Sequence, residues 1–70
     1  MQIEYTKHAL YQLDERKVDS VWVEETVKCP DELRIDGLKH YAIKKLNGKT
    51  LKVVCVKETY IKIITLFWIQ

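Results

Sequence analysis

The chain of 70 residues has the length of one small domain, which buries only about 60% of the surface that its unfolded form exposes. Apolar residues make up 47% and charged residues 31% of it, as in soluble globular proteins and unlike disordered or membrane chains. No segment approaches the roughly 20 apolar residues that cross a bilayer, and the opening MQIEYTK lacks the apolar region of a signal peptide. We therefore expect a single cytoplasmic domain over residues 1–70.

Cysteine and charge give two further expectations. Cys29 and Cys55 are the only cysteines and lack metal-binding spacing, which favours free, buried thiols. Residues 1–36 carry nine acids against five bases, a balance of −4, whereas residues 37–70 carry seven lysines and one glutamate, a balance of +6. This asymmetry suggests a positive surface that meets an anionic partner, although solvated lysines on a strand-rich half explain it equally well.

The first half of the chain predicts two helices. Thr6 is a good N-cap for a helix from Thr6 to about Arg16, and Asp19 begins a second one over about Ser20 to Cys29. Pro30 ends the second helix, and the break between the two predicts a helical hairpin. The expected buried stripe of the first helix consists of Ala9, Leu10 and Leu13.

The second half predicts strands joined by tight turns. Asp36-Gly37 and Asn47-Gly48 are dipeptides that favour two-residue type I′ hairpins. The expected strands are about Glu32 to Ile35, Leu38 to Leu46, Lys49 to Lys57 and Tyr60 to Trp68. The predicted fold class is α+β, with two N-terminal helices packed on one face of a four-stranded antiparallel meander, to which Gln2 to Tyr5 can add a short edge strand.

Two-residue turns also fix which side chains share a face. The expected opposite pairs are Arg34 with Lys39, Ile43 with Lys52, Lys45 with Thr50, and Lys52 with Thr65. The face covered by the helices is expected to hold Leu33, Ile35, Leu38, Ala42, Leu46, Leu51, Val53, Cys55, Ile64 and Leu66. Three polar residues on that face, His40, Lys44 and Lys62, are expected at its margin with their heads in water.

The other face is predicted to be basic with aromatic residues among the charges. Its expected members are Arg34, Lys39, Tyr41, Ile43, Lys45, Thr50, Lys52, Val54, Thr65 and Phe67. Such a face suits RNA, because lysines meet phosphates and rings meet unstacked bases. We expect no metal site, because the histidines are far apart and the acids are scattered along helical exteriors, and no phosphate-binding glycine loop, because both glycines are assigned to turns.

Six short pieces, in this order of elements, carry a family resemblance. They are Tyr5-Thr-Lys-His-Ala9, Glu15-Arg16, Val18-Asp19, Cys29-Pro30, Lys52-Val53-Val54 and Ile64-Thr65. The chain resembles the RelE/ParE-like toxin superfamily of microbial-ribonuclease-like fold, especially its small members that open with Ser/Thr-x-His-Ala. Two residues depart from that pattern: Gln12 stands where a first arginine is common, and Lys17 replaces the usual turn glycine and would need a left-handed backbone.

The resemblance implies RNA cleavage without metal or cofactor, or inhibition of a cellular target such as the ribosome, held in check by an antitoxin protein. It makes His8, Tyr41 and Lys52 the catalytic candidates, with His8 as base or acid and Tyr41 as an alternative acid. The positive end of a helix disfavours a protonated imidazole, which suits His8 as a base. The candidates for holding RNA phosphate are Arg16, Arg34, Lys45 and Lys52, with Thr65 binding an oxygen or orienting Lys52.

Other interpretations remain open at this point. His8 can be a polar residue at the margin of the helical stripe, and Arg16 a cation that stabilises the helix end. Trp22 and Trp68 are expected to be packing residues, although Trp22, near the start of the second helix, could serve a partner. At the level of the whole domain, the alternatives to a ribonuclease are a noncatalytic module whose basic face binds nucleic acid or an acidic protein segment, and a degenerate, inactive relative.

Overall fold

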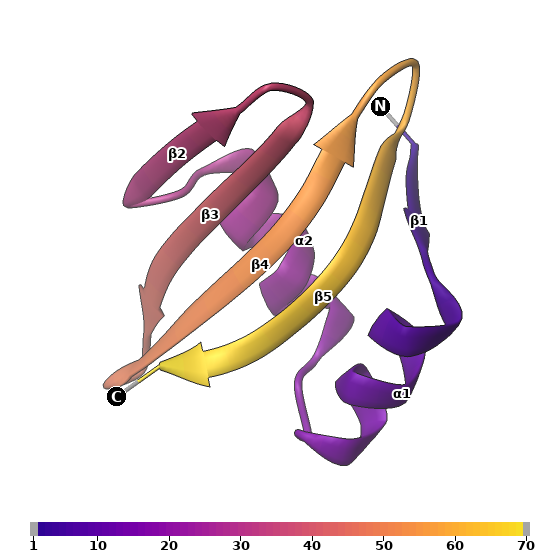
Figure 1. Cartoon of the computed structure of the whole chain (residues 1–70). Coiled ribbons are helices and arrows are strands. Elements are labelled where there is room, and N and C mark those ends of the chain that lie inside the picture. The colour runs from indigo at the N-terminus through magenta and orange to yellow at the C-terminus, as the bar shows by residue number, and fades with distance from the viewer. Residues whose placement is uncertain (1, 70) are drawn as a thin grey trace.

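Two helices and five strands make up the computed structural model, which describes residues 2–69 (Figure 1). In chain order they are β1 (Ile3–Tyr5), α1 (Lys7–Glu15), α2 (Ser20–Lys28), β2 (Glu32–Asp36), β3 (Lys39–Leu46), β4 (Lys49–Lys57) and β5 (Ile61–Ile69). The strands form one sheet in the order β1-β5-β4-β3-β2. No helix in the described part of the chain is long and apolar enough to span a membrane.

The α+β class is confirmed, but the sheet is mixed rather than a purely four-stranded antiparallel meander. Strands β2 to β5 follow one another antiparallel, and β1 joins β5 in parallel. The short edge strand is therefore present. A two-residue turn would force β1 and β5 to pair antiparallel, but these strands are separated by most of the chain, so parallel pairing is open to them.

The predicted helix ends are confirmed by their caps. The Thr6 hydroxyl accepts a hydrogen bond from the Ala9 backbone N–H at 3.1 Å, and Asp19 Oδ1 accepts one from the Val21 N–H at 2.9 Å. After α1 the chain turns at Lys17, whose φ of 53° is left-handed. The N–H groups of Lys17 and Val18 bond back to carbonyls of α1 at 3.3 and 3.0 Å, which is the Schellman arrangement that usually carries glycine at this position.

Each helix packs on the sheet rather than mainly on the other helix. Helix α2 crosses β3 and β4 on the face turned away from the viewer in Figure 1, whereas α1 lies along β5 beyond the end of β1. There Gln12 replaces a strand as the hydrogen-bonding partner of β5: its Oε1 accepts the Leu66 backbone N–H at 3.1 Å and the Thr65 hydroxyl. The Trp68 indole also donates to the Arg16 carbonyl at 3.0 Å.

This position of α1 changes its predicted buried stripe. Ala9 is buried as expected and Leu13 packs against the core, but Leu10 is 51% exposed. Gln12 is only 8% exposed, because its amide meets the unpaired edge of β5. The prediction for Leu10 was therefore wrong, since the helix rests on polar backbone as well as on apolar side chains.

The core lies between the helices and one face of β4 and β5. Its buried members are Ala9, Val18, Val23, Val27, Leu51, Val53, Cys55, Ile61, Ile63 and Leu66. Trp22 and Trp68 pack beside it edge to face, with ring centroids 5.9 Å apart. This contact fits the packing role expected of both tryptophans.

The turn before β5 and a β-bulge within this strand decide which of its residues enter the core. Val54 pairs with Thr65, but Cys55 pairs with Ile63, so Ile64 is the extra residue. Because the turn before β5 is one residue longer than expected, with Lys57 opposite Ile61, Ile63 lies in the core, and Ile64, which was expected on the covered face, is partly exposed. Lys62, expected at the margin of the covered face, instead pairs with Val56 on the opposite face.

The two hairpin turns differ in type. Asn47 and Gly48 both have positive φ, 49° and 82°, as a type I′ turn requires. In the first hairpin Asp36 pairs with Lys39, so the loop is Gly37-Leu38 and only Gly37, with φ 63°, is left-handed. That pattern is typical of a type II′ turn, and the register consequently moves by two residues without exchanging the faces.

The margin of the covered face also differs from expectation. Lys44 does not extend its head into water: its Nζ donates to the Cys29 carbonyl at the end of α2 at 2.9 Å. His40 has its Nδ1 buried without a hydrogen-bond partner in the described part of the chain. The helices pack mainly on β3, β4 and β5 rather than on β2, and three apolar residues expected under them are exposed: Leu33, Ile35 and Leu38.

Candidate nucleic-acid interface

The sheet face opposite the helices, here called the open face, carries the predicted basic residues. The register groups its side chains into rows that run across the strands. One row is Arg34, Tyr41, Val54 and Thr65, and the next is Glu32, Ile43, Lys52 and Phe67. Lys45 and Thr50 form a third, shorter row. Arg34, Lys45 and Lys52 therefore share this face, as the alternation of side chains predicts.

Two of the predicted opposite pairs are found and two are replaced. Ile43 opposes Lys52, and Lys45 opposes Thr50. Arg34 opposes Tyr41 rather than Lys39, because the first turn lies one residue later than expected. Lys52 opposes Phe67 rather than Thr65, because the turn before β5 is one residue longer than expected, with Lys57 opposite Ile61, and the bulge at Ile64 shifts β5 by one residue more.

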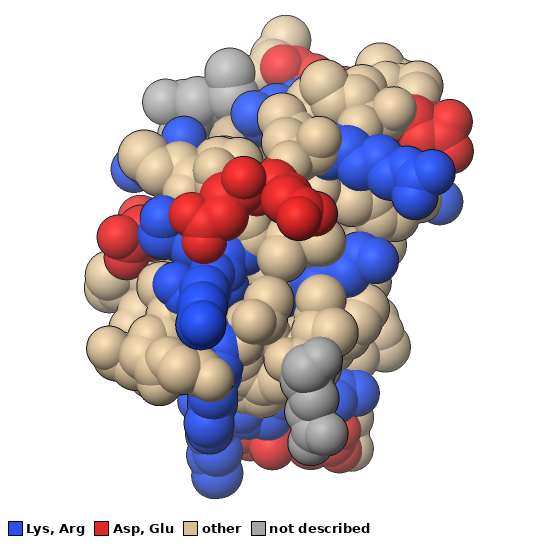
Figure 2. Space-filling model, turned by 90° about the vertical axis from the view of Figure 1, so that its left-hand side faces the viewer, with Lys and Arg blue, Asp and Glu red and all other residues tan. Residues whose placement is uncertain are grey.

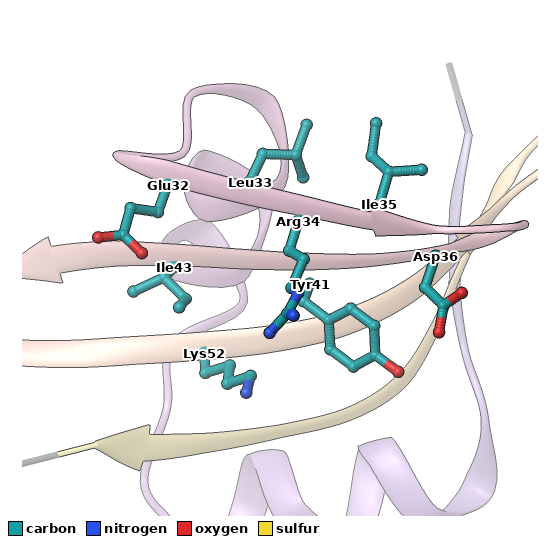
Figure 3. A pocket seen from close by; sticks show the side chains of 8 residues that line it. All are labelled: Glu32, Leu33, Arg34, Ile35, Asp36, Tyr41, Ile43 and Lys52. Atoms are coloured by element: carbon teal, nitrogen blue, oxygen red, sulfur yellow. The ribbon is translucent and has the colours of Figure 1, made fainter.

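A hollow of about 700 Å³ lies on the open face beside β2. Its lining residues are Glu32, Leu33, Arg34, Ile35, Asp36, Tyr41, Ile43 and Lys52. Figure 3 shows the Arg34 and Lys52 side chains approaching the same space next to the Tyr41 ring, while Leu33 and Ile35 point to the opposite side of β2. The hollow is thus bounded by two cations and an aromatic ring.

Lys52 is the best-positioned cation of this site. Its Nζ lies 5.5 Å from the centroid of the Tyr41 ring and 5.8 Å from that of Phe67. Both distances are within the range of cation–π attraction. Two rings from neighbouring strands thus hold one partly buried lysine, so its charge occupies a defined place on the sheet.

Two carboxylates that the sequence prediction missed also line the hollow. Glu32 and Asp36 alternate with Arg34 along β2 and share its face (Figure 3). Neither forms an ion pair within the part of the chain that the structure describes. The alternation in Glu32-Leu-Arg-Ile-Asp36 was the available signal, but Asp36 was expected in a turn and Glu32 was not among the residues expected on the open face.

The remaining predicted site residues do not line the hollow. His8 is exposed in the first turn of α1, and Arg16 caps the end of that helix. Thr65 lies on the row of Arg34 and Tyr41, but its hydroxyl bonds Gln12. Lys45 stands one row beyond Lys52. The structure therefore gathers Tyr41, Lys52 and Arg34, leaves Lys45 and Thr65 on the flanks, and separates His8 and Arg16.

The two thiols have different environments. Cys55 is buried and Cys29 is exposed, so the expectation of two buried thiols holds only for Cys55. Burial, the larger cause, raises the pKa of the Cys55 thiol above its ordinary value of 9.0, while the charge of Lys57 acts in the opposite direction. A thiol that stays protonated is a poor nucleophile, and Cys55 faces the core rather than the open face.

Comparisons with known proteins match the chain to one family. No curated protein and no solved structure matches the chain. The profile of the family described as "Domain of unknown function (DUF4258)" matches residues 5–68, a span that runs from the last residue of β1 almost to the end of β5. The chain therefore belongs to the DUF4258 family.

Proposed function

We propose that this protein is a toxin-like domain that binds RNA on its open face and cleaves it without a metal. The observation that carries the proposal is Lys52 held between the rings of Tyr41 and Phe67, with Arg34 beside the same hollow. A fixed cation flanked by rings meets both parts of an unpaired nucleotide, because phosphate attracts the cation and a base can stack on a ring. Duplex RNA would offer only its phosphates to this face.

Cleavage would use groups at the same hollow. A base takes the proton of a ribose 2′-hydroxyl, the 2′-oxygen attacks phosphorus, and the 5′-oxygen leaves with a proton from an acid, giving a 2′,3′-cyclic phosphate. Arg34 and Lys52 would stabilise the charge on the phosphate oxygens. The Tyr41 phenol is the candidate acid, and the carboxylates of Glu32 and Asp36 are nearer candidates for the base than His8, which lies outside the hollow. An antitoxin that covers this face belongs to the same proposal.

A second candidate function is a noncatalytic module that binds RNA on the same face. The observations that favour it are the positions of His8 and Arg16 outside the hollow and the use of the Thr65 hydroxyl by Gln12. Gln12 stands where an arginine is common in the RelE/ParE-like superfamily that the chain resembles, and it has a structural role at the edge of β5. Both functions need the open face, and they differ only in whether the bound RNA is cut.

The test compares two lysines of β4 whose side chains lie on opposite faces. Lys52 is on the open face, whereas Lys49 places its Nζ 5.3 Å from the Trp68 ring centroid on the covered side. Binding of fluorescent single-stranded RNA is measured at several salt concentrations for Lys52→Ala and Lys49→Ala. We expect Lys52→Ala to weaken binding and lower the salt slope by about one, with little change in Lys49→Ala.

Cleavage is measured on the same RNA with a chelator present. Cutting that survives the chelator and is lost in Lys52→Ala supports the ribonuclease, and salt-dependent binding without any cutting supports the noncatalytic module. Binding that is equal in the two lysine variants, or absent from the wild type, contradicts both.

A further inference from the structure

Strand β2 forms a free edge of the sheet. It pairs only with β3, and all five of its residues are exposed. The other edge strand, β1, has three residues and runs directly into α1, and α1 covers β5 where β1 ends. The backbone of β2 therefore offers the longest unpaired run of N–H and C=O groups among the described strands, and such an edge is a template for another strand.

The charges along β2 do not protect this edge. Proteins commonly block an edge strand with charges that repel a second copy. Here the open-face residues alternate in sign, Glu32, Arg34 and Asp36. Figure 2, which views the molecule from the side where β2 lies in Figure 1, shows acidic and basic side chains next to one another rather than a field of one sign.

We propose that β2 pairs antiparallel with β2 of a second copy, so that two five-stranded sheets become one. A two-fold axis perpendicular to the sheet makes such a contact self-complementary. The symmetric register with Arg34 opposite Arg34 also sets Glu32 opposite Asp36, and like charges in opposition disfavour it. A shift of one residue along each strand removes both conflicts.

Two shifted registers keep the open faces on the same side and join opposite charges. In one, Glu32 opposes Arg34 of the second copy, and in the other Arg34 opposes Asp36 of the second copy. Each forms two such pairs by symmetry, and each contributes cross-strand attraction of the kind that stabilises sheets. The acid–base–acid order therefore disfavours the symmetric register, in which like charges oppose each other, and favours the two shifted registers, in which opposite charges do.

The apolar residues of β2 fit the same arrangement. Leu33 and Ile35 are 47% and 59% exposed on the face that carries the helices, at the edge beyond the strands that α2 covers. The first register sets Leu33 against Leu33 of the second copy, and the second sets Ile35 against Ile35. Pairing therefore removes apolar surface from water on one face while it joins charges on the other. The proposal does not rest on RNA binding, and its experiment contains no RNA, although Glu32, Arg34 and Asp36 also line the hollow.

The experiment uses two charge variants that cannot pair with themselves. Arg34→Glu makes the open side of β2 wholly acidic, and the double variant Glu32→Lys, Asp36→Lys makes it wholly basic. Molar mass is measured by light scattering and sedimentation over a wide range of protein concentration. We expect the wild type to dimerise as its concentration rises, each variant alone to remain monomeric, and an equimolar mixture of the two to form a heterodimer.

The control is Lys62→Glu, which makes the same charge reversal on the open face of β5, away from β2. It should dimerise like the wild type, and circular dichroism establishes that every variant is folded. A wild type that stays monomeric at the highest concentration overturns the proposal. So does a dimer that survives in both charge variants, or a mixture of them that fails to associate.

Discussion

The two faces of the sheet differ in their exposure to water. The covered face of β4 and β5 holds Leu51, Val53 and Leu66 fully out of water, and its residues act together through packing. On the open face a lysine and an arginine stand among rings with their charges accessible. The covered face thus supplies the stability of the domain and the open face its accessible charges. Substitutions on the covered face should therefore mainly affect folding, and substitutions on the open face should mainly affect binding.

The largest effect is expected at the core. Leu66→Ala leaves a cavity at a residue with no exposed surface and should lower the free energy of unfolding by about 2–5 kcal/mol. Lys52→Ala on the neighbouring row of the open face should lower it by only about 0.5–1 kcal/mol through the lost cation–π contacts. Urea denaturation followed by tryptophan fluorescence measures both. Equal losses would remove the distinction between the faces.

Gln12 sharpens the comparison because it is polar and buried at the edge of the covered face. Gln12→Leu keeps the size of the side chain but leaves the Leu66 N–H without its acceptor. We expect a loss of about 1–3 kcal/mol, the usual penalty for a buried donor left unpaired. The exposed neighbour Tyr11, as Tyr11→Leu, is the matched control in the same denaturation experiment. If both variants unfold at the wild-type midpoint, α1 does not depend on this contact.

Lys17 tests the turn that carries the chain from α1 to α2. Its left-handed φ of 53° is a strain for a residue with a Cβ atom, so Lys17→Gly should stabilise the protein by up to about 1 kcal/mol. The shift of the denaturation midpoint measures it. The exposed helical substitution Lys7→Gly should act in the opposite direction, and stabilisation by both changes would point to a cause other than the turn.

The smallest effect concerns pH. Because the pKa of Cys55 is raised by burial, the unfolded chain loses this proton first as pH rises through 9.0. The unfolded state then binds fewer protons than the folded state, so stability falls with rising pH above that value. Unfolding measured from pH 8 to pH 9.5 should show this slope in the wild type and a weaker one in Cys55→Ala. An identical slope in both proteins would contradict a buried, protonated thiol.

Local sequence signals predicted much of this fold because they act over a few residues. Thr6 and Asp19 are caps, Asn47-Gly48 has the backbone freedom of its turn, and alternation placed Arg34, Lys45 and Lys52 on one face. The register differs from the prediction by two residues at the first hairpin and in β5 after the bulge, and a shift of two preserves the face of each side chain. Before the bulge the shift is one residue, so Lys62 and Ile63 change face.

The features that sequence could not supply depend on contacts between distant segments. The parallel pairing of β1 joins residues separated by most of the chain, and the burial of Gln12 follows from where α1 lands on β5. The longer turn before β5 exchanges the faces of Lys62 and Ile63, and the bulge at Ile64 restores the predicted face from Thr65 onward, and no glycine in the sequence marks either feature. The same limit applies to the site, since only the folded sheet shows that Glu32 and Asp36 belong to the hollow and His8 does not.

The most direct test of the open face as the RNA-binding side is an NMR titration with single-stranded RNA that follows aromatic ring signals. The molecule contains its own control: Tyr41 and Phe67 flank Lys52, while Trp22 and Trp68 pack against the core. Stacked bases should shift and broaden the ring signals of Tyr41 and Phe67 and leave both indoles unchanged. Shifts confined to the indoles, or no shifts at all, would contradict it.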